Sequence, residues 1–383
     1  MSKKINFSIL SISLLTVMAG AAVAPALGII QQHFSDSPTM LLRFIVSLPA
    51  LFIILVSLLF TQVSKLLRTR TIALIGLIMY VVCGMGVFFV QDMTTMLILR
   101  AMLGVSVGLI MPLSTGLLAY YNPPADMPNL MGLSAAMNQM GGIIATLLAG
   151  FLANIEWNFA FLVYAFGLPA IVLVILYLPN EKIHTSKTHE TTHRKDSRNV
   201  VRRYHPCVFG MLLCMGLFFV FVTNFAITES SKFSTLTITY LMVGVDVIAF
   251  IAGMAFGKIL TKLSTLIKYI PPFAYFVAFT LLAFAPNAIS TIIALMFIGV
   301  ANGCGIPYLN TIASIKGGKD SITTVMPLLS ASLYLGQFLS PIVVGGLSSM
   351  IFDNDPAGSY KTGIAFAAVY IIQVISTRHF WNQ

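Results

Sequence analysis

Two stretches of this chain repeat one another. Residues 104–112 read GVSVGLIMP and residues 299–307 read GVANGCGIP, so that Gly104, Gly108 and Pro112 recur after a shift of 195 as Gly299, Gly303 and Pro307. Two further glycines recur at the same shift: Gly141 as Gly336 and Gly150 as Gly345. Echoes at one common offset indicate two homologous halves, each about half of the chain.

The composition places both halves in a membrane. The chain is 58% hydrophobic and only 9% charged, and a water-soluble protein with so little charge would expose large apolar patches. Apolar runs of roughly 20 residues are long enough to cross a bilayer. Twelve runs qualify: Phe7–Ile30, Met40–Phe60, Thr71–Val90, Thr95–Tyr121, Leu130–Ala153, Phe159–Leu178, Cys207–Ile227, Ser234–Phe256, Ile267–Ala285, Ala288–Ile312, Ser321–Ile351 and Thr362–Thr377.

These runs are expected to be helices, because a helix satisfies its own backbone hydrogen bonds in lipid. The sequence therefore predicts an all-α membrane protein with twelve transmembrane helices in two pseudo-symmetric six-helix bundles. The predicted bundles are residues 1–178 and 206–383, and the polar segment 179–205 between them is expected to be a cytoplasmic linker. The first apolar run is too long for the core of a signal peptide and is interpreted as the first span.

The basic residues predict the orientation. With the N-terminus inside and twelve crossings, every Lys and Arg except Arg43, Arg100, Lys232 and Lys361 falls on the cytoplasmic side, as the positive-inside rule requires. We therefore expect a multi-pass protein of the cell membrane with both termini in the cytoplasm. The net charge of +10 is thereby explained without nucleic-acid binding.

Metal and cofactor chemistry is not indicated. The four cysteines form no close pair, and the linker histidines His184, His189 and His193 lie in a segment where nothing would hold a ligand geometry. The sequence contains no catalytic triad, zinc-protease or phosphate-loop pattern, so an enzyme is not expected. A cofactor is not expected either, and the energy source would be a proton or sodium gradient.

Two motifs carry a family resemblance. They are Arg100-x-x-x-Gly104-x-x-x-Gly108 in span four and Gly336-x-x-x-Ser340-Pro341-x-x-x-Gly345 in span eleven. Together with twelve spans, two repeats and a central cytoplasmic loop, they resemble the major facilitator superfamily over the whole chain. The second motif resembles that of bacterial drug and sugar efflux members. The resemblance implies a secondary transporter that works by alternating access.

The sequence departs from the family pattern at two places. The family's gating loop between spans two and three carries an acid, where this chain has Ser64, and a second glycine, where it has Leu67. The loss of the acid is expected to weaken the latch or to move it elsewhere. The basic residues expected at this loop and at its second-half copy are Lys65, Arg68, Arg70, Lys258 and Lys262. Span five also lacks the Gly-Pro of proton antiporters and has Ala145-Thr146 instead.

Ionisable groups within a span are costly in lipid, so each is a functional hypothesis. Asp246, near the middle of span eight, is the candidate proton-coupling residue. A protonated Asp246 that only joins two helices is the structural alternative. Arg100 is expected to bind backbone carbonyls and to tune the proton site, as the family motif implies. Its alternatives are extension of the side chain to the outer surface or contact with a substrate anion, and Arg43 is expected to be an interfacial anchor.

The family fold places spans one, four, seven and ten around the substrate cavity. By this resemblance, we expect the substrate-cavity candidates to include Asn224, Asn302 and Asn310, with Asn138 and Gln139 in span five as further candidates. Each buried amide also needs partners for purely structural reasons. The glycines and Pro112, Pro307 and Pro341 are expected to serve helix packing and bending.

The favoured function is proton-coupled efflux of a small amphipathic compound. The alternative is an importer or facilitator of a polar or anionic nutrient, which the altered span five permits, and a non-transporting membrane sensor is the remote alternative. The expected partners are a small-molecule substrate and the lipid bilayer, with no nucleic acid, and the chain is expected to be monomeric.

Overall fold

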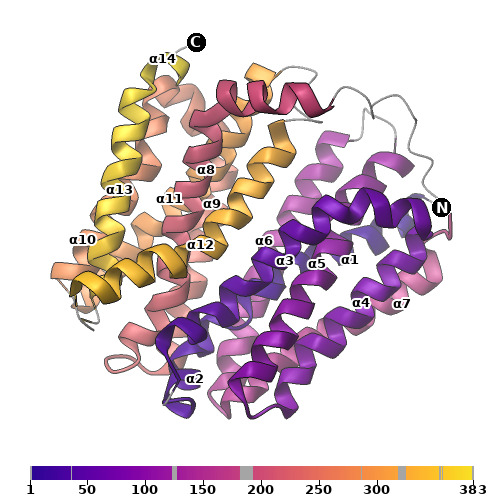
Figure 1. Cartoon of the computed structure of the whole chain (residues 1–383), viewed down its shortest axis with the longest axis horizontal. Helices are drawn as coiled ribbons and strands as arrows, with labels where there is room; N and C mark the ends of the chain where they lie inside the picture. Colours follow the sequence, from indigo (N-terminus) through magenta and orange to yellow (C-terminus); the bar gives the residue numbers. More distant parts are fainter. Residues whose placement is uncertain are drawn as a thin grey trace. The chain divides into compact units, whose positions relative to one another are not determined.

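The computed structural model describes residues 2–35, 37–122, 127–181, 193–285, 287–317, 325–352, 355 and 357–381. These residues form helices and turns, without a strand among them. The helices of the first half (Figure 1) are α1 (Ser2–Ala21), η1 (Ala24–Ala26), α2 (Leu27–His33), α3 (Thr39–Leu66), α4 (Thr69–Gly86), η2 (Val87–Phe89), α5 (Met93–Tyr121), α6 (Met127–Ala153), η4 (Trp157–Phe166) and α7 (Gly167–Tyr177). Those of the second half are α8 (His193–Glu229), α9 (Thr235–Leu263), η6 (Ser264–Tyr269), α10 (Ile270–Phe284), α11 (Ala288–Gly317), α12 (Met326–Phe352), α13 (Gly358–Ser376) and α14 (Arg378–Trp381).

Twelve of the described helical segments are long and apolar enough to cross a membrane, which confirms the predicted fold class. Some spans combine two kinds of helix. The first joins α1, η1 and α2 over Lys3–His33, and the sixth joins η4 and α7 over Trp157–Tyr177. Pro25 lies within η1, and because proline lacks an N–H group, the regular helix ends before it.

The chain divides into two compact units. One contains Met1–Thr185 with Glu229–Tyr240, and the other contains Ser186–Thr228 with Leu241–Gln383. Part of the segment expected to be linker is helical, since α8 begins at His193 and runs for 37 residues. A helix is favoured there because the apolar span that follows extends the same hydrogen-bonded ladder toward the N-terminus.

Close helix contacts in each unit occur at the repeated glycines. In the first unit, Gly104 and Gly108 of α5 lie against α3. A Cβ atom at Gly104 would come within 2.8 Å of Pro49 Cα, and one at Gly108 within 2.7 Å of Val56 Cβ. Lipid provides no hydrophobic force to join helices, so their association depends on such close backbone packing.

The second unit repeats this contact between α11 and α9. A Cβ atom at Gly299 would come within 2.9 Å of Val245 O, and one at Gly303 within 2.8 Å of Ala249 Cα. The second and fourth spans of each half are therefore joined in the same way, by the two glycines that the sequence repeats.

A second pair of helices is also joined alike in both units. Gly141 of α6 lies against the Leu14 backbone of α1, and Gly336 of α12 lies against the Leu212 backbone of α8. Ser340, one turn after Gly336, donates a hydrogen bond to Gly216 O at 2.8 Å. The glycine of the span-eleven motif thus packs the fifth span of the half against the first.

Four spans are buried most deeply in the protein. Within an apolar stretch of 18 residues in each span, the buried share is 61% for the first span, 56% for the fourth, 72% for the seventh and 56% for the tenth, whereas in the other eight it is between 33% and 50%. These four are spans one, four, seven and ten, the spans that the family resemblance assigns to the centre.

The sixth span begins with an unusual segment. Residues Trp157–Phe166 form a 3₁₀ helix of ten residues before the α-helix begins at Gly167. Runs of this helix type longer than three or four residues are uncommon. η4 packs against α4 and α6 and carries Tyr164, a fully buried residue.

Two glycines of the second unit offer a direct test of the packing. Replacing Gly303 with alanine would place a methyl group against the Ala249 backbone, so we expect a loss of stability of about 1–3 kcal/mol from overpacking. Gly257 of α9 has no atom within 4 Å of its Cβ position, so Gly257→Ala should be neutral or raise stability by up to about 1 kcal/mol through helix propensity. Thermal unfolding of the purified variants measures both, and equal melting temperatures would contradict the packing role of Gly303.

Candidate functional site

Arg100 is the most deeply buried charged residue among the described side chains, with 0% of its surface exposed. Its Nε donates to Ile45 O at 2.6 Å, its Nη2 donates to Ala19 O at 2.8 Å, and its Nη1 donates to Tyr164 Oη. These acceptors are neutral and lie on α3, α1 and η4. Arg100 of α5 thus ties three other segments of the first unit to its own helix.

Both carbonyl acceptors of Arg100 are groups that their own helices leave without a donor. Ile45 O would accept from the N–H group of residue 49 in a regular helix, but residue 49 is proline and has no N–H. Ala19 lies in the last turn of α1, which ends at Ala21, and the final carbonyls of a helix have no partner within it. Arg100 therefore supplies donors where the backbone lacks them.

Tyr164 extends the cluster to η4. Its hydroxyl group donates to Ala19 O at 2.9 Å while accepting from Arg100, and its ring lies edge-on to the ring of Tyr80 of α4, with centroids 5.4 Å apart. A Cβ atom at Gly84 would collide with the Tyr164 ring. The side chain of Arg100 is thus enclosed within the unit and does not extend to the surface. Its effect on a proton site stays a prediction.

Asp246 lies on the part of α9 that packs against α11. The flanking residues Val245 and Ala249 contact Gly299 and Gly303, and Asp246 itself is half-buried. The two halves of the chain differ at the positions of Asp246 and Arg100. A shift of 195 takes Asp246 to Leu51 and Arg100 to Leu295, so the repeated helix pair holds a cation in one unit and an acid in the other.

The predicted cavity amides differ in their bonding. Asn138 Oδ1 accepts from Thr16 Oγ1 at 2.9 Å, which joins α6 to α1. Asn224 of α8 is buried, and its Nδ2 donates to Val220 O at 2.7 Å and to Thr223 Oγ1 at 3.1 Å. The Oδ1 atoms of Asn224 and Asn302 are buried without a hydrogen-bond partner among the described residues. Gln139 and Asn310 are half-buried.

The predicted gating loop is shorter than expected. Ser64 and Lys65 belong to the last turn of α3, Arg68 is the N-cap of α4, and Arg70 lies in its first turn. Lys258 and Lys262 belong to the last turns of α9 and are exposed. The loop itself is therefore reduced to Leu67 and Arg68.

Arg70 makes its contact within its own unit. Its Nη2 donates to Ile175 O, one of the unpaired carbonyls at the C-terminal end of α7, where a cation is favourable. The neighbouring Thr69 binds the start of the predicted linker, with its N–H and Oγ1 groups both 3.0 Å from Glu181 O. These bonds hold the α3–α4 turn to the end of the sixth span.

The prolines and the remaining glycine of the motifs lie inside helices, as expected: Pro112 in α5, Pro307 in α11, and Pro341 and Gly345 in α12. His184 and His189 lie outside the described residues, and His193 is the first residue of α8. The described residues contain no group of His, Cys, Asp or Glu that could hold a metal ion.

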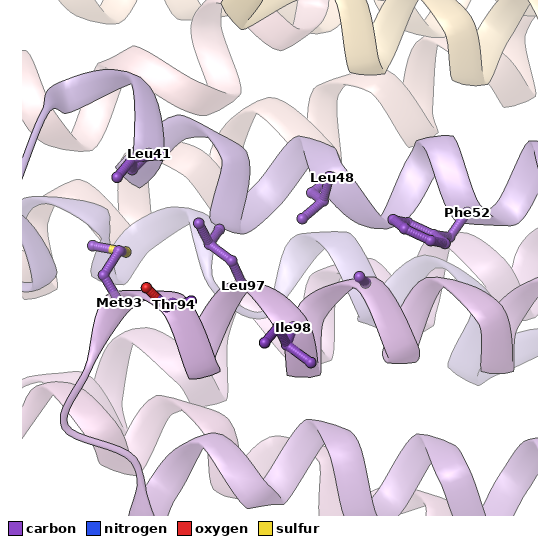
Figure 2. Close-up of a pocket in the computed structure, with 8 residues that line it drawn as sticks. Leu41, Leu48, Phe52, Met93, Thr94, Leu97 and Ile98 are labelled. Atoms are coloured by element: carbon purple, nitrogen blue, oxygen red, sulfur yellow. The ribbon is translucent and has the colours of Figure 1, made fainter.

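A groove of about 330 Å³ lies between α3 and α5 in the first unit. Leu41, Leu48 and Phe52 line it from α3, while Met93, Thr94, Leu97, Ile98 and Ala101 line it from α5 (Figure 2). Apart from Thr94 its lining is apolar, and it contains none of the predicted site residues. It therefore does not suit a polar substrate.

Sequence reasoning missed Tyr164 and Glu229. Glu229, at the end of α8, is 2% exposed and forms an ion pair with Lys232, 3.1 Å from Oε2 to Nζ. The predicted seventh span ended two residues before it. Tyr164 lies 64 residues from Arg100 in sequence, and no local pattern connects the two.

These features describe a polytopic membrane protein built from two repeated units. Residues 9–341 match the sequence model of the Major Facilitator Superfamily. The chain belongs to this family, which confirms the resemblance and makes the protein a transporter-family member and not an enzyme. No curated protein sequence matches the chain significantly.

Several solved structures share the fold. The crystal structure of the nucleoside transporter NupG has a TM-score of 0.76 and 14% identity and covers 99% of both chains. The crystal structure of a D-xylose–proton symporter has a TM-score of 0.76 and 15% identity and covers 96% of both chains. A bacterial homologue of the human lysosomal transporter Spinster has a TM-score of 0.73 and 14% identity, covering 99% of this chain and 96% of that one.

We predict that Arg100→Leu destabilises the protein far more than Arg43→Leu. The first change leaves Ile45 O without a donor, at a cost of about 1–3 kcal/mol, and removes a donor from Ala19 O and from Tyr164 Oη, which remain bonded to each other. Thermal unfolding in detergent measures the difference. Equal, small losses would show that Arg100 does not hold the helices together.

Pro49→Ala provides the matched test of the mechanism. Alanine restores the N–H group of residue 49, so Ile45 O regains a donor within α3. Arg100→Leu should then cost less in the Pro49→Ala background than in the wild type, by about 1 kcal/mol. Strict additivity of the two changes would contradict the pairing of Arg100 with the carbonyl that Pro49 releases.

Proposed function

We propose that this chain is a proton-coupled secondary transporter that carries a small polar solute inward across the cytoplasmic membrane by alternating access. Family membership supports transport. The identity of the carried solute, its direction and the coupling ion are parts of the proposal, as are a monomeric state and an orientation with both termini in the cytoplasm.

The proposal of a polar solute rests on one observation, the unpaired side-chain oxygen of Asn224. An amide oxygen buried on the most deeply buried span, without a donor among the described residues, favours a solute that forms hydrogen bonds. The similar structures include a nucleoside transporter and a xylose–proton symporter, and their solutes are of this polar kind.

Export of an amphipathic compound, favoured by the span-eleven motif, has less support. In the structure Gly336 of that motif packs α12 against α8, and Ser340 donates a hydrogen bond to Gly216 O. A motif with this packing role carries no information about direction. No other feature of the described residues favours export, and the altered span five is compatible with uptake.

Proton coupling is assigned to Asp246, an acid within a membrane span beside the α9–α11 contact. An acid there can bind a proton on one side of the membrane and release it on the other. The energy would come from an ion gradient without a bound cofactor. Arg100 would act from the first unit by holding α1, α3, α5 and η4 in one arrangement.

The test is uptake of labelled solutes by cells that contain the protein, with and without a protonophore. We expect accumulation of a sugar or a nucleoside that the protonophore abolishes. Reduced accumulation of amphipathic dyes, restored by the protonophore, would instead establish export and overturn the proposed direction.

Asp246→Asn should abolish accumulation against a gradient while leaving equilibrium exchange of the same solute intact, because binding persists without proton transfer. Uptake by the wild type should rise as external pH falls, and exchange by the variant should not respond. Asp355→Asn, which removes an acid already paired with Lys361, is the control and should retain accumulation. Full accumulation by Asp246→Asn would remove this residue from the mechanism.

A further inference from the structure

The bonding of Asn224 shows which end of its amide is used within the protein and which end is left without a partner among the described residues. Both donor contacts of Nδ2 are made inside α8, to Val220 O at 2.7 Å and to Thr223 Oγ1 at 3.1 Å. Thr223 Oγ1 in turn donates its own hydrogen to Phe219 O at 2.6 Å. The donor end of the amide is therefore used within the helix, and only the acceptor oxygen is left.

The opposite orientation of this amide is unfavourable. A rotation of 180° would place Oδ1 against Val220 O and against a hydroxyl oxygen whose hydrogen is already committed to Phe219. Two acceptor–acceptor contacts would replace two hydrogen bonds. The assignment of nitrogen and oxygen in Asn224 thus follows from its neighbours.

Asn302 of α11 presents a second acceptor in the same unit. Its Oδ1 is also buried without a partner among the described residues. Asn302 directly precedes Gly303, which fixes α11 against α9. α8 and α11 are the two most deeply buried spans of the second half, so both acceptors lie on its central helices.

The absence of lysine and arginine from these two spans further limits the chemical class of the ligand. Residues 204–229 and 288–313, which form the two spans, contain no Lys or Arg. A carboxylate or phosphate would meet acceptor oxygens there and no lysine or arginine on either span, which is a costly arrangement in a buried site. A hydroxyl or N–H group would satisfy the same oxygens.

We infer that Asn224 and Asn302 supply two acceptors of the solute site and that the solute is a neutral molecule presenting hydroxyl or N–H donors, such as a sugar, a polyol or a nucleoside. This inference rests on the proposed transport function and names its substrate class. It decides between the neutral and the anionic nutrient that the sequence leaves open. Such a site would bind a solute without donors more weakly than one with donors, because the first leaves the two acceptor oxygens buried and unpaired.

The experiment measures binding to the purified full-length protein by the rise of its melting temperature with each probe. The probes are D-xylose, uridine, the O-methylated forms of both, benzoate as an anion and tetraphenylphosphonium as a cation without donors. We expect stabilisation by xylose or uridine, and binding weaker by about a hundredfold or more after O-methylation.

Two variants, Asn224→Leu and Asn302→Leu, remove the acceptors with little change in volume. Each should weaken binding of the donor-bearing probe about ten- to a hundredfold. Asn158→Leu is the matched control, because Asn158 Nδ2 donates to Phe88 O at 3.1 Å and its Oδ1 is likewise buried without a partner, but it lies on η4. Because Asn302 is only half-buried, its variant tests the inference even if Asn224→Leu folds poorly.

Unchanged affinity in both variants would overturn the inference and assign the two oxygens to bound water. Preferential binding of benzoate, of tetraphenylphosphonium or of O-methylated probes would overturn it as well. Each of these results leaves the transporter assignment intact, since that is judged by protonophore-sensitive movement of any probe in cells. Absence of all such movement, by contrast, would count against the proposed function.

Discussion

A backbone carbonyl inside a bilayer must find its donor within the protein, and this constraint organises the first unit. Pro49 releases Ile45 O from its helix, the end of α1 releases Ala19 O, and Arg100 binds both. The end of α7 releases Ile175 O, and Arg70 binds it. A guanidinium group suits this task because it carries several donors and never loses its charge. Two arginines thus supply hydrogen-bond donors to backbone carbonyls that a proline or a helix end leaves unpaired.

The second constraint is the need for close contact between helices that lipid does not push together. Glycines meet it at the same places in both halves, between the second and fourth spans and between the first and fifth. The repeated part of the sequence is therefore the packing framework. The parts that differ, Arg100 against Leu295 and Asp246 against Leu51, are where function can diverge without disturbing that framework.

Much of the fold could be predicted from the sequence, because span length, apolar runs and repeated glycines are local or periodic signals. The partners of Arg100 could not, since Ile45 and Tyr164 lie 55 and 64 residues away, although a proline four residues after Ile45 marks that carbonyl as unpaired. The direction of transport that the span-eleven motif predicts stays a prediction, because in the structure its glycine packs α12 against α8. The acceptor role of Asn224 depends on the hydrogen bonds that its Nδ2 donates within α8. The identity of the residue alone does not predict these bonds.

The 3₁₀ segment η4 makes the sixth span longer than an α-helix with the same number of residues. Ten residues rise roughly 20 Å in a 3₁₀ helix and roughly 15 Å in an α-helix. Rewinding Trp157–Phe166 into an α-helix would shorten the span by about 5 Å and would turn Tyr164 about the helix axis, away from Ala19 and Arg100. The Tyr164 hydroxyl forms its hydrogen bonds in the stretched segment, so the length of the span and the position of the buried arginine would change together.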